Sequence, residues 1–357
     1  MEENLLLEIK DLQVYFYLQE GTVRAVEGVD LKIKRGTTVG LVGESGCGKS
    51  VTAFSILQVV SRPGRVVGGQ IKLHRLLNTD QAGNRQVETI DLAALDPRSR
   101  EMRAIRGRDI AMVFQEPMTS LSMMHTIGFQ IDEAIRLHNK VTKAESRKRA
   151  IELLRRVGIP KPEERIDAYP FQLSGGMRQR AMIAMALSCN PSLLIADEPT
   201  TALDVTTQAQ IMELITELQR EIGMSVLLIT HDLGVVAETC EEVVVMYLGM
   251  IMEKSGVKEL FADPLHPYTR ALLNSIPRLG YGRSVELEPI EGMVPDPYNR
   301  PIGCPFHPRC PNFMAEVCDV QVPEVTVMPD GREVRCHIYT GGVRMAGTTL
   351  STLPEQG

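Results

Sequence analysis

The chain has 357 residues, of which 43% are hydrophobic and 24% charged, with 39 Lys and Arg against 45 Asp and Glu. This length predicts about two domains with a sizeable core, and the composition excludes wholesale disorder, collagen-like repeats and coiled coils. The net charge of -6 lacks the basic excess of a dedicated nucleic-acid-binding protein, so nucleic acid is not an expected partner.

Neither a membrane-spanning helix nor a signal peptide is expected. The longest uncharged stretches, such as residues 181–196, are interrupted by polar residues and proline and fall short of the roughly 20 apolar residues that a spanning helix needs. The N-terminus begins with MEEN and has no basic start, apolar run or cleavage site. These features predict a cytosolic protein, in which the seven cysteines are thiols or metal ligands rather than disulfides.

The first half of the chain alternates between strand and helix patterns. Residues 5–33 predict an antiparallel β subdomain with a turn at Glu20-Gly21, and residues 37–43 predict a buried strand that leads through a glycine-rich loop into a helix. Residues 69–110 predict a strand, a polar turn (78–86), a basic helix and a second strand. Residues 126–157 predict one helix, whose basic run lacks interleaved aromatic residues and is most simply a solvated face.

The second half of the chain continues the alternation of strands and helices up to about residue 256, after which the composition changes. Two buried strands, PSLLIAD and MSVLLITHD, flank a helix over residues 206–222, which favours a parallel sheet. Beyond about Gly256 prolines become frequent, which predicts a small appendage. The last residues, 341–357, are rich in Gly, Thr and Ser and are expected to form a flexible tail.

Three segments carry candidate chemistry. GESGCGKS (residues 43–50) matches a phosphate-binding loop: glycines turn N–H groups toward phosphate oxygens, Lys49 neutralises charge and Ser50 binds Mg²⁺. A chance glycine-rich turn is the alternative, but the strand before it and the helix after it are both predicted. LLIADE ends a strand with Asp197, suited to the Mg²⁺ shell, and Glu198, suited to act as general base. In LSGGM, Ser174 stands at an N-cap position, before a helix start that offers N–H groups to an anion.

Six segments, taken in chain order, resemble the motifs of ABC-transporter ATPases. They are GESGCGKS, Gln115 in MVFQEPM, LSGGM, LLIADE, TALD (residues 201–204) and His231 in LLITHD. The resemblance spans about residues 5–255. It implies an α/β fold class with a phosphate-loop core, an antiparallel β subdomain and a helical subdomain at about 117–190, and a nucleotide-sandwich dimer. The expected domains are an ATPase domain over 1–256 and an appendage over 257–340.

The resemblance also implies roles for individual residues. Phe16 is similar to the aromatic residue that stacks on adenine, with Tyr15 and Tyr17 as alternatives. The implied catalytic residues are Glu198, His231, Gln115 and Lys49, and the implied Mg²⁺ ligands are Ser50, Gln115 and Asp197. The implied ATP-binding set is Phe16, Gly43, Glu44, Ser45, Gly46, Cys47, Gly48, Lys49, Ser50, Val51, Gln115, Ser174, Gly175, Gly176, Asp204 and His231.

The sequence departs from the family pattern at three places, which bear on local and partner contacts and leave the residues implied in hydrolysis unchanged. Met177 replaces a common glutamine, Ser122-Met123 replaces the usual Asn-Pro, and residues 73–90 are longer than is common. The last two changes lie near surfaces that in relatives face the membrane subunits.

Further motifs narrow the resemblance to peptide importers, a group that includes nickel, glutathione and oligosaccharide systems. ELFADPLHPYTRALLNSIP is the most specific of them, although on its residues alone it predicts only a helix start, and no chemistry is assigned to His266. A cysteine-bearing segment follows, with Cys304, Cys310, Cys318 and Cys336. Spacing leaves a metal centre, disulfides and free thiols open; the resemblance favours a [4Fe-4S] cluster, with zinc as the alternative because His307 and His337 are close in sequence. Cys47, Cys189 and Cys240 are expected to be ordinary packing residues.

We therefore expect an ATP-hydrolysing subunit on the cytoplasmic face of the membrane that energises import of di- or oligopeptides. Its implied partners are a second ATPase chain, in a heterodimer, two permeases and an extracytoplasmic binding protein. A soluble ABC ATPase acting on ribosomes or DNA is disfavoured by the single motif set and the acidic charge. A nucleotide-binding regulator without turnover is disfavoured by the complete set of catalytic residues.

Overall fold

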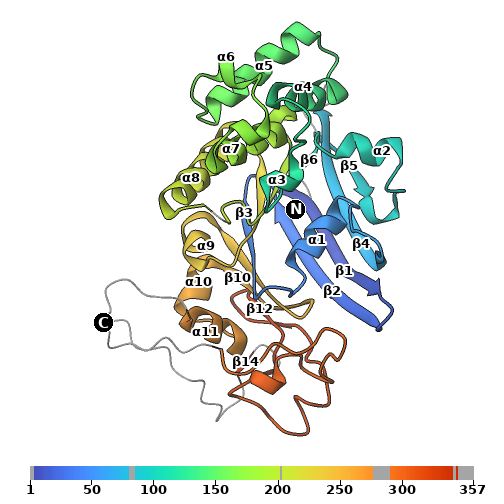
Figure 1. The fold of residues 1–357 in the computed structure, drawn as a ribbon. Helices are drawn as coiled ribbons and strands as arrows, with labels where there is room; N and C mark the ends of the chain where they lie inside the picture. The colour runs from blue at the N-terminus through green and yellow to red at the C-terminus, as the bar shows by residue number, and fades with distance from the viewer. Residues whose placement is uncertain (1–3, 80–84, 202, 276–289, 341–342, 345–357) are drawn as a thin grey trace.

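The computed structural model describes residues 4–79, 85–201, 203–275, 290–340 and 343–344 (Figure 1). Ala202 and all but two residues of the expected tail over 341–357 lie outside this part of the chain. Within it, no helix is both long and apolar enough to cross a lipid bilayer.

The first sheet is the predicted antiparallel β subdomain. Its strand order is β2-β1-β4-β5. The strands are β1 (Leu5–Tyr17), β2 (Thr22–Lys34), β4 (Gly64–Thr79) and β5 (Arg85–Asp91). Of the turn expected over residues 78–86, residues 80–84 lie outside the described part of the chain. The expectation that a helix comes directly after the turn was wrong, because β5 follows there and pairs with β4. RQVETID has few apolar residues, so its strand conformation follows from that pairing and not from a hydrophobic run.

The second sheet has eight strands in the order β11-β12-β10-β9-β3-β8-β7-β6. They are β3 (Thr38–Val42), β6 (Ile110–Val113), β7 (Leu193–Asp197), β8 (Ser225–Ile229), β9 (Glu242–Tyr247), β10 (Met250–Gly256), β11 (Thr326–Val327) and β12 (Glu333–Val334). The strands from β9 to β6 are parallel, as predicted, whereas β10 and β12 add antiparallel strands. The appendage thus extends the central sheet. A small pair, β13 (Tyr339–Thr340) and β14 (Val343–Arg344), follows.

The α-helices in the described residues are α1 (Lys49–Ile56), α2 (Arg100–Ile105), α3 (Pro117–Ser120), α4 (Ile127–His138), α5 (Lys143–Arg156), α6 (Pro162–Arg165), α7 (Gly175–Ala186), α8 (Val205–Ile222), α9 (Leu233–Thr239), α10 (Val257–Ala262) and α11 (Pro267–Asn274). Of these, α4, α5 and α6 lie together at one end of the molecule (Figure 1). The single helix expected over 126–157 was wrong. It is broken between α4 and α5, where Thr142 caps α5 by accepting a hydrogen bond from the Glu145 N–H. A β-branched residue with a short hydroxyl favours such a cap over a helix interior.

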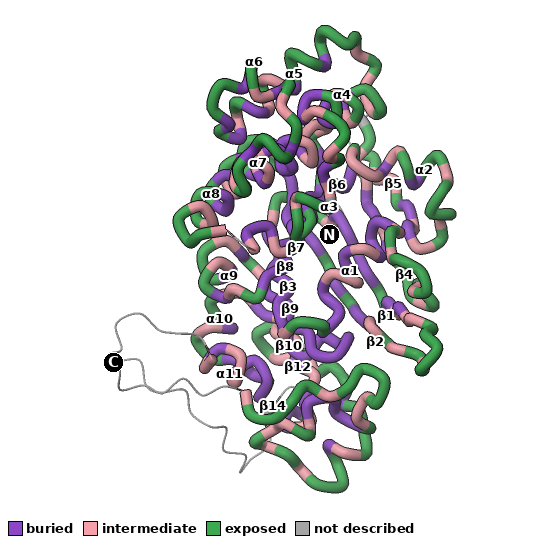
Figure 2. Tube along the Cα trace, in the orientation of Figure 1, coloured by how far each residue is buried: buried purple, intermediate pink, exposed green. Residues whose placement is uncertain are grey.

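The core lies on both faces of the central sheet, whose strands run through the middle of the molecule (Figure 2). Successive residues of β7 alternate between two apolar clusters, with Leu194 in one and Leu193 and Ile195 in the other. The first cluster also contains Cys304 and Phe306, so the cysteine-bearing segment shares the core of the α/β unit. In Figure 1 this segment lies at the end of the molecule opposite α4–α6.

Candidate functional site

The glycine-rich loop connects the end of β3 to the start of α1. Gly43 has φ of 149° and Gly48 has φ of 101°, backbone values that side chains disfavour. A Cβ atom on Gly43 would lie 2.2 Å from the Met246 carbonyl oxygen, and one on Gly48 would lie 2.3 Å from that of Ala25. Glycine is therefore required at both positions, since the loop is pressed against neighbouring backbone.

Lys49 is the first residue of α1 and is only 6% exposed. Its Nζ donates hydrogen bonds to the carbonyl oxygens of Gly43, at 2.8 Å, and Glu44, at 3.0 Å. The ammonium group thus lies inside the curve of its own loop. Ser45 and Gly46, at the tip of the loop, are exposed. The arrangement holds a cation behind accessible backbone, which suits a phosphate group.

Ser50 and Asp197 meet across α1 and β7. The Ser50 hydroxyl donates a 3.0 Å hydrogen bond to Asp197 Oδ1, and Asp197 is 3% exposed. Burial raises the pKa of the Asp197 carboxyl, as does the nearby Glu198, whereas the Ser50 hydrogen bond and Lys49 lower it. These two hard oxygen groups, close together and partly buried, fit a Mg²⁺ ion that takes one carboxylate, one hydroxyl and its remaining ligands from phosphate and water.

Glu198 follows directly, in a left-handed backbone conformation with φ of 46°. Its carboxylate accepts hydrogen bonds from Gln115 Nε2 and Thr201 Oγ1, both at 2.9 Å, and lies 3.3 Å from His231 Nδ1. Gln115 comes from the loop after β6 and His231 from the loop after β8. Three loops at the carboxyl ends of parallel strands therefore meet at one half-exposed carboxylate, where ligands commonly bind in α/β sheets.

The residues of LSGGM and TALD lie at two adjacent helix starts. As predicted, Ser174 is the N-cap of α7 and accepts a hydrogen bond from the Met177 N–H. Asp204 caps α8 by accepting from the Thr207 N–H at 2.9 Å. A Cβ atom on Gly176 would lie 3.1 Å from Thr207 Cγ2, so the two starts are close together. Within the chain their hydrogen bonds run to their own first turns.

The three candidate aromatic residues of β1 differ in surroundings. Phe16 packs, partly buried, against the second apolar cluster. The Tyr15 hydroxyl donates to Glu27 Oε1 at 2.9 Å. Tyr17 is 42% exposed, with the Arg65 guanidinium carbon 4.4 Å from its ring centroid. The hydrogen bond to Glu27 therefore ties the Tyr15 ring to β2, whereas no ring hydrogen bond of Tyr17 is found within the described residues.

The four cysteines of the appendage gather without forming a complete ligand set. Cys304, Cys318 and Cys336 are buried, and all seven cysteines of the chain are free. Burial and, to a smaller extent, the charges of the other three thiols raise the pKa of the Cys336 thiol to about 12, so the four sulfur atoms lie within electrostatic reach of one another. In the described part of the chain, however, no three His, Cys, Asp or Glu side chains are arranged to hold a metal ion.

Outside the appendage, Cys47 and Cys240 are buried and Cys189 is half-buried, as expected for packing residues. His266 is 1% exposed and is the N-cap of α11, accepting from the Tyr268 N–H at 3.0 Å. His266 thus caps the helix that begins with Pro267 and Tyr268.

Two residues that the sequence did not single out contact the glycine-rich loop. The Tyr268 hydroxyl accepts a 2.9 Å hydrogen bond from the Glu44 N–H, and Arg309 forms an ion pair with the Glu44 carboxylate at 2.7 Å. Both come from beyond residue 256, and no spacing rule links them to a phosphate loop.

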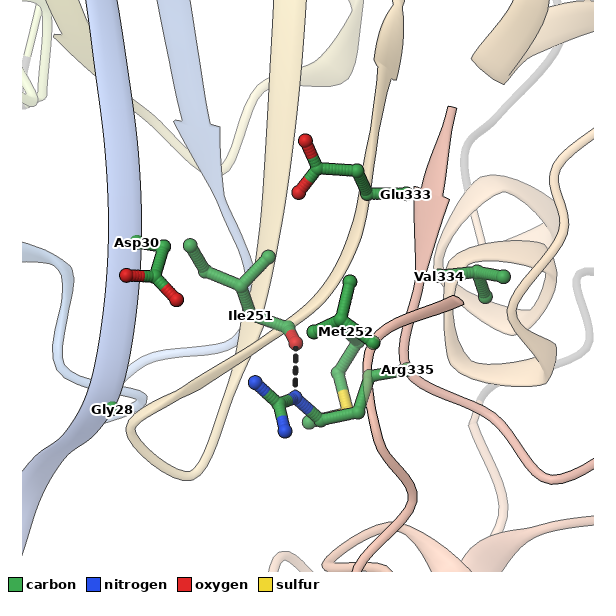
Figure 3. Close-up of a pocket in the computed structure, with 8 residues that line it drawn as sticks. Gly28, Asp30, Ile251, Met252, Glu333, Val334 and Arg335 are labelled. Carbon is green, nitrogen blue, oxygen red and sulfur yellow. Dashed lines mark hydrogen bonds between the residues drawn. The ribbon is translucent and has the colours of Figure 1, made fainter. Parts of the chain in front are cut away.

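A small cavity lies between β2, β10 and the appendage (Figure 3). The Arg335 Nε atom donates to the Ile251 carbonyl oxygen at 3.1 Å beside it. The residues that line the cavity are Gly28, Asp30, Ile251, Met252, Val325, Glu333, Val334 and Arg335. None of them belongs to the nucleotide-site motifs.

Two family models match the chain. Residues 26–201 match "ABC transporter" and residues 252–318 match "Oligopeptide/dipeptide transporter, C-terminal region". The second match begins at β10 and includes three of the four appendage cysteines.

Curated relatives are similar over almost their whole length. A probable peptide ABC transporter ATP-binding protein, y4tR of Sinorhizobium fredii, is 49% identical over 93% of this chain and 95% of its own. The dipeptide transport ATP-binding protein DppD of Haemophilus influenzae is 48% identical over 93% and 95%. The oligopeptide transport ATP-binding protein AppD of Bacillus subtilis is 49% identical over 94% and 97%.

Solved structures are similar over the α/β unit. The ATP-binding cassette MJ0796, in a dimeric post-hydrolysis state with ADP and Pi, matches with a TM-score of 0.60 and 28% identity over 71% of this chain and 99% of its own. The protein cbiO1 of Clostridium perfringens, part of a cbiONQ transporter complex, matches with a TM-score of 0.57 and 29% identity over 73% and 92%.

Proposed function

The chain belongs to the ABC transporter family, among its peptide-transport ATP-binding proteins, and on this premise we propose that it hydrolyses ATP to energise import of di- or oligopeptides. The observation that carries the proposal is the convergence of Lys49, Ser50, Asp197 and Glu198 at the carboxyl ends of β3 and β7. A phosphate loop beside a buried Mg²⁺ ligand and an accessible base is the set that ATP hydrolysis requires.

Glu198 is the proposed general base. Its Oε2 atom accepts from Gln115 and Thr201, which orients the carboxylate, and its Oε1 atom faces His231. A water placed at this carboxylate would lose a proton to it while attacking the γ-phosphate. Lys49 would leave the Gly43 and Glu44 carbonyl oxygens for the phosphates, and His231, which is exposed, would contact the γ-phosphate.

Ser50 and Asp197 are the proposed protein ligands of Mg²⁺, with Gln115 as a further one. Ser50 and Asp197 would hold the ion beside the phosphate loop, where it would supply positive charge against the charge that develops on the phosphate. The Ser50–Asp197 hydrogen bond already sets two oxygen atoms 3.0 Å apart, and Asp197 is tied to the strand end. Gln115 is exposed on its loop and so can move between Glu198 and the ion.

Closure of two such chains is proposed for turnover. The exposed starts of α7 and α8, with Ser174, Gly175, Gly176 and Asp204, would complete the phosphate site of a second ATPase chain. Bound ATP would hold the pair together, and loss of the γ-phosphate would release it. A related but distinct chain, giving a heterodimer, is the proposed partner. Phe16 is the proposed adenine platform in this site, with Tyr17 as its rival.

The surface proposed to meet two permeases is apolar and lies on the helical segment. Met124, Phe129 and Phe171 are exposed, and the Tyr169 and Phe171 rings stack at 5.5 Å. Backbone hydrogen bonds from Ile127 to Ala168 and from Gly128 to Ile166 hold these segments side by side. A patch of this kind marks a protein interface. The chain would thereby sit peripherally on the cytoplasmic face of the membrane, served by an extracytoplasmic binding protein.

We also propose that the four appendage thiols bind a [4Fe-4S] cluster, with zinc as the alternative. Their burial and mutual proximity support this, and ligation would cross-link a segment that is rich in proline. Ligation would replace the thiol protons, which the raised pKa values of Cys304, Cys310 and Cys336 otherwise favour.

The test is mass spectrometry of proteins that co-purify with the Glu198→Gln chain, extracted with ATP from membranes of its host under anaerobic conditions. Two permeases, a second ATPase and a binding protein support the proposal, and the ligand retained by that binding protein distinguishes peptides from nickel, glutathione or oligosaccharides. Ribosomal or DNA-bound partners without a permease would refute it.

A further inference from the structure

Glu44, the second residue of the glycine-rich loop, is held by the appendage at both its backbone and its side chain. The Tyr268 hydroxyl accepts a 2.9 Å hydrogen bond from the Glu44 N–H. Arg309 Nη1 lies 2.7 Å from Glu44 Oε2, and Arg309 Nη2 lies 3.1 Å from Glu44 Oε1. This two-pronged geometry fixes the direction of the carboxylate as well as its distance.

Each of the two holding residues is itself fixed. Tyr268 is fully buried on α11, whose start is capped by His266. The Arg309 side chain is 3% exposed, its Nη1 also donates to the Tyr247 hydroxyl at 3.3 Å, and its Nε donates to the Glu291 carbonyl oxygen at 3.0 Å. A guanidinium with this many partners has little freedom to follow Glu44 if the loop moves.

An aromatic cluster joins these residues to the central sheet. Tyr247 ends β9, and its ring centroid lies 4.7 Å from that of Tyr268 and 5.3 Å from that of Phe306. Tyr268 and Phe306 are 5.3 Å apart, and all three side chains are fully buried. Tyr247 follows Met246, whose carbonyl oxygen lies so near Gly43 that it leaves no room for a Cβ atom there. The support beneath the loop is therefore continuous from β9 to the cysteine-bearing segment.

The first two residues of the glycine-rich loop are held by their neighbours, whereas the next two are exposed, and this difference indicates what the contacts of Tyr268 and Arg309 do. Gly43 and Glu44 are pinned, whereas Ser45 and Gly46 are exposed. The Glu44 N–H is used by Tyr268 and so is directed away from any ligand. The Cys47 N–H donates to the Glu44 carbonyl oxygen at 3.3 Å, so the exposed Ser45 and Gly46 supply the N–H groups that remain for phosphate. Because loop amides bind phosphate only in one backbone arrangement, a shift of Glu44 changes all of them.

We propose that Tyr268 and Arg309 are positioning residues for phosphate binding: the appendage holds Glu44 so that the glycine-rich loop is preformed for the nucleotide. The proposal rests on the proposed function of the loop in binding ATP. It assigns to the appendage a direct part in the nucleotide site of its own chain.

The test measures equilibrium binding of ATP with Mg²⁺ to the full-length chain, by calorimetry, alongside steady-state hydrolysis in the assembled complex. Tyr268→Phe removes only the hydroxyl and keeps the ring in the aromatic cluster. Arg309→Gln removes the charge. Each is expected to raise the dissociation constant for ATP about tenfold and to change kcat at saturating ATP less than threefold, since the loop contacts phosphate in ground and transition states alike.

Matched controls separate positioning from general stability. Tyr298→Phe changes an exposed appendage tyrosine, and Arg332→Gln removes an appendage arginine whose ion pairs are with Asp330 and Asp263. Both should leave ATP affinity unchanged even if Arg332→Gln lowers the unfolding temperature. Hydrogen exchange of residues 43–48 should speed up in Tyr268→Phe and Arg309→Gln only.

The outcomes discriminate between the two proposals. If the parent chain binds ATP and both variants bind it with the same affinity, the positioning role is refuted while the ATPase assignment stands. If the parent chain itself does not bind ATP, the proposed function fails. In a double-mutant cycle, Glu44→Gln combined with Arg309→Gln should lose little more ATP affinity than either single variant, whereas additive losses would contradict a role of Arg309 through Glu44.

Discussion

Gln115 and Glu198, 83 residues apart in sequence, are joined by a 2.9 Å hydrogen bond from Nε2 to Oε2. The same oxygen atom accepts from Thr201, which leaves Oε1 as the more open oxygen of the carboxylate, beside His231. The proposed base is therefore oriented by two neutral donors and keeps one oxygen for a water.

Replacement of Glu198 by Gln is the first prediction. ATP binding should persist, because the phosphate loop is untouched, while turnover in the assembled complex falls by about 10² to 10⁴, the range typical for loss of a general base. Phosphate release measured against ATP retention checks this. The control, Glu213→Gln, changes an exposed residue of α8 and should turn over at the parent rate. Parent-like hydrolysis by Glu198→Gln would show that another group is the base.

The phosphate loop and the strand-end acids could be predicted because both depend on local sequence. Gly43 and Gly48 have backbone conformations that favour glycine, and a cluster of glycines is visible in a single chain. Asp197 ends a run of apolar residues, which marks a buried strand without any knowledge of its neighbours. The order of the motifs then supplied the family and, with it, the fold.

Other features depend on contacts that no local pattern encodes. β5 exists because β4 offers it a partner, and the break after α4 depends on a cap at Thr142. The contact of Arg309 with Glu44 joins residues 265 positions apart. An arginine before a cysteine has no distinctive spacing, so its place behind the loop required the three-dimensional structure.

Replacement of Asp197 by Asn should separate metal binding from stability. The Mg²⁺ concentration for half-maximal hydrolysis is expected to rise at least about tenfold, because the proposed carboxylate ligand is lost. The unfolding temperature should not fall: burial raises the pKa of Asp197, so its charged form opposes folding at neutral pH and the neutral amide does not. Hydrolysis titrated with Mg²⁺ and thermal unfolding at pH 7 check both. A parent-like Mg²⁺ dependence would contradict the assignment.

The apolar patch on the helical segment predicts a selective loss of assembly. Phe171→Ser should reduce co-purification of permeases severalfold and leave ATP affinity of the chain unchanged, because this side chain is 62% exposed and far in sequence from the phosphate loop. Val327→Ser is the matched control, since Val327 is also 62% exposed but lies on β11 of the appendage. Equal losses from both variants would show that the patch has no specific role.

The appendage thiols predict a metal requirement. Anaerobically purified chain should contain iron and acid-labile sulfide, measured by elemental analysis, and Cys336→Ser should lose most of both. Cys189→Ser, which alters a half-buried cysteine elsewhere in the chain, should retain them. Stoichiometric zinc without sulfide would favour the alternative site, and a chain free of both metals would refute metal binding.

Acid should destabilise the appendage through His266. Burial lowers the pKa of this imidazole to about 3, below its value in the unfolded chain. Above about pH 6.5 the group is neutral in both states. As pH falls from there toward 3, only the unfolded chain takes up the proton, so the free energy of unfolding decreases by about 1.4 kcal/mol per pH unit. Glu253 accepts hydrogen bonds from the Leu265 and His266 N–H groups, and burial raises its pKa, which opposes this trend at the acid end.

A difference between variants isolates the contribution of His266. His266→Asn keeps a side-chain acceptor at the N-cap of α11 and removes the titrating group, so its unfolding free energy, measured with urea between pH 7 and pH 5, should depend less on pH than that of the parent. The exposed His125, changed to Asn, serves as control and should retain the slope of the parent. Identical slopes for His266→Asn and the parent would mean that the buried imidazole is protonated in the folded chain, in which case its hydrogen bond from the Tyr268 N–H could not form as observed.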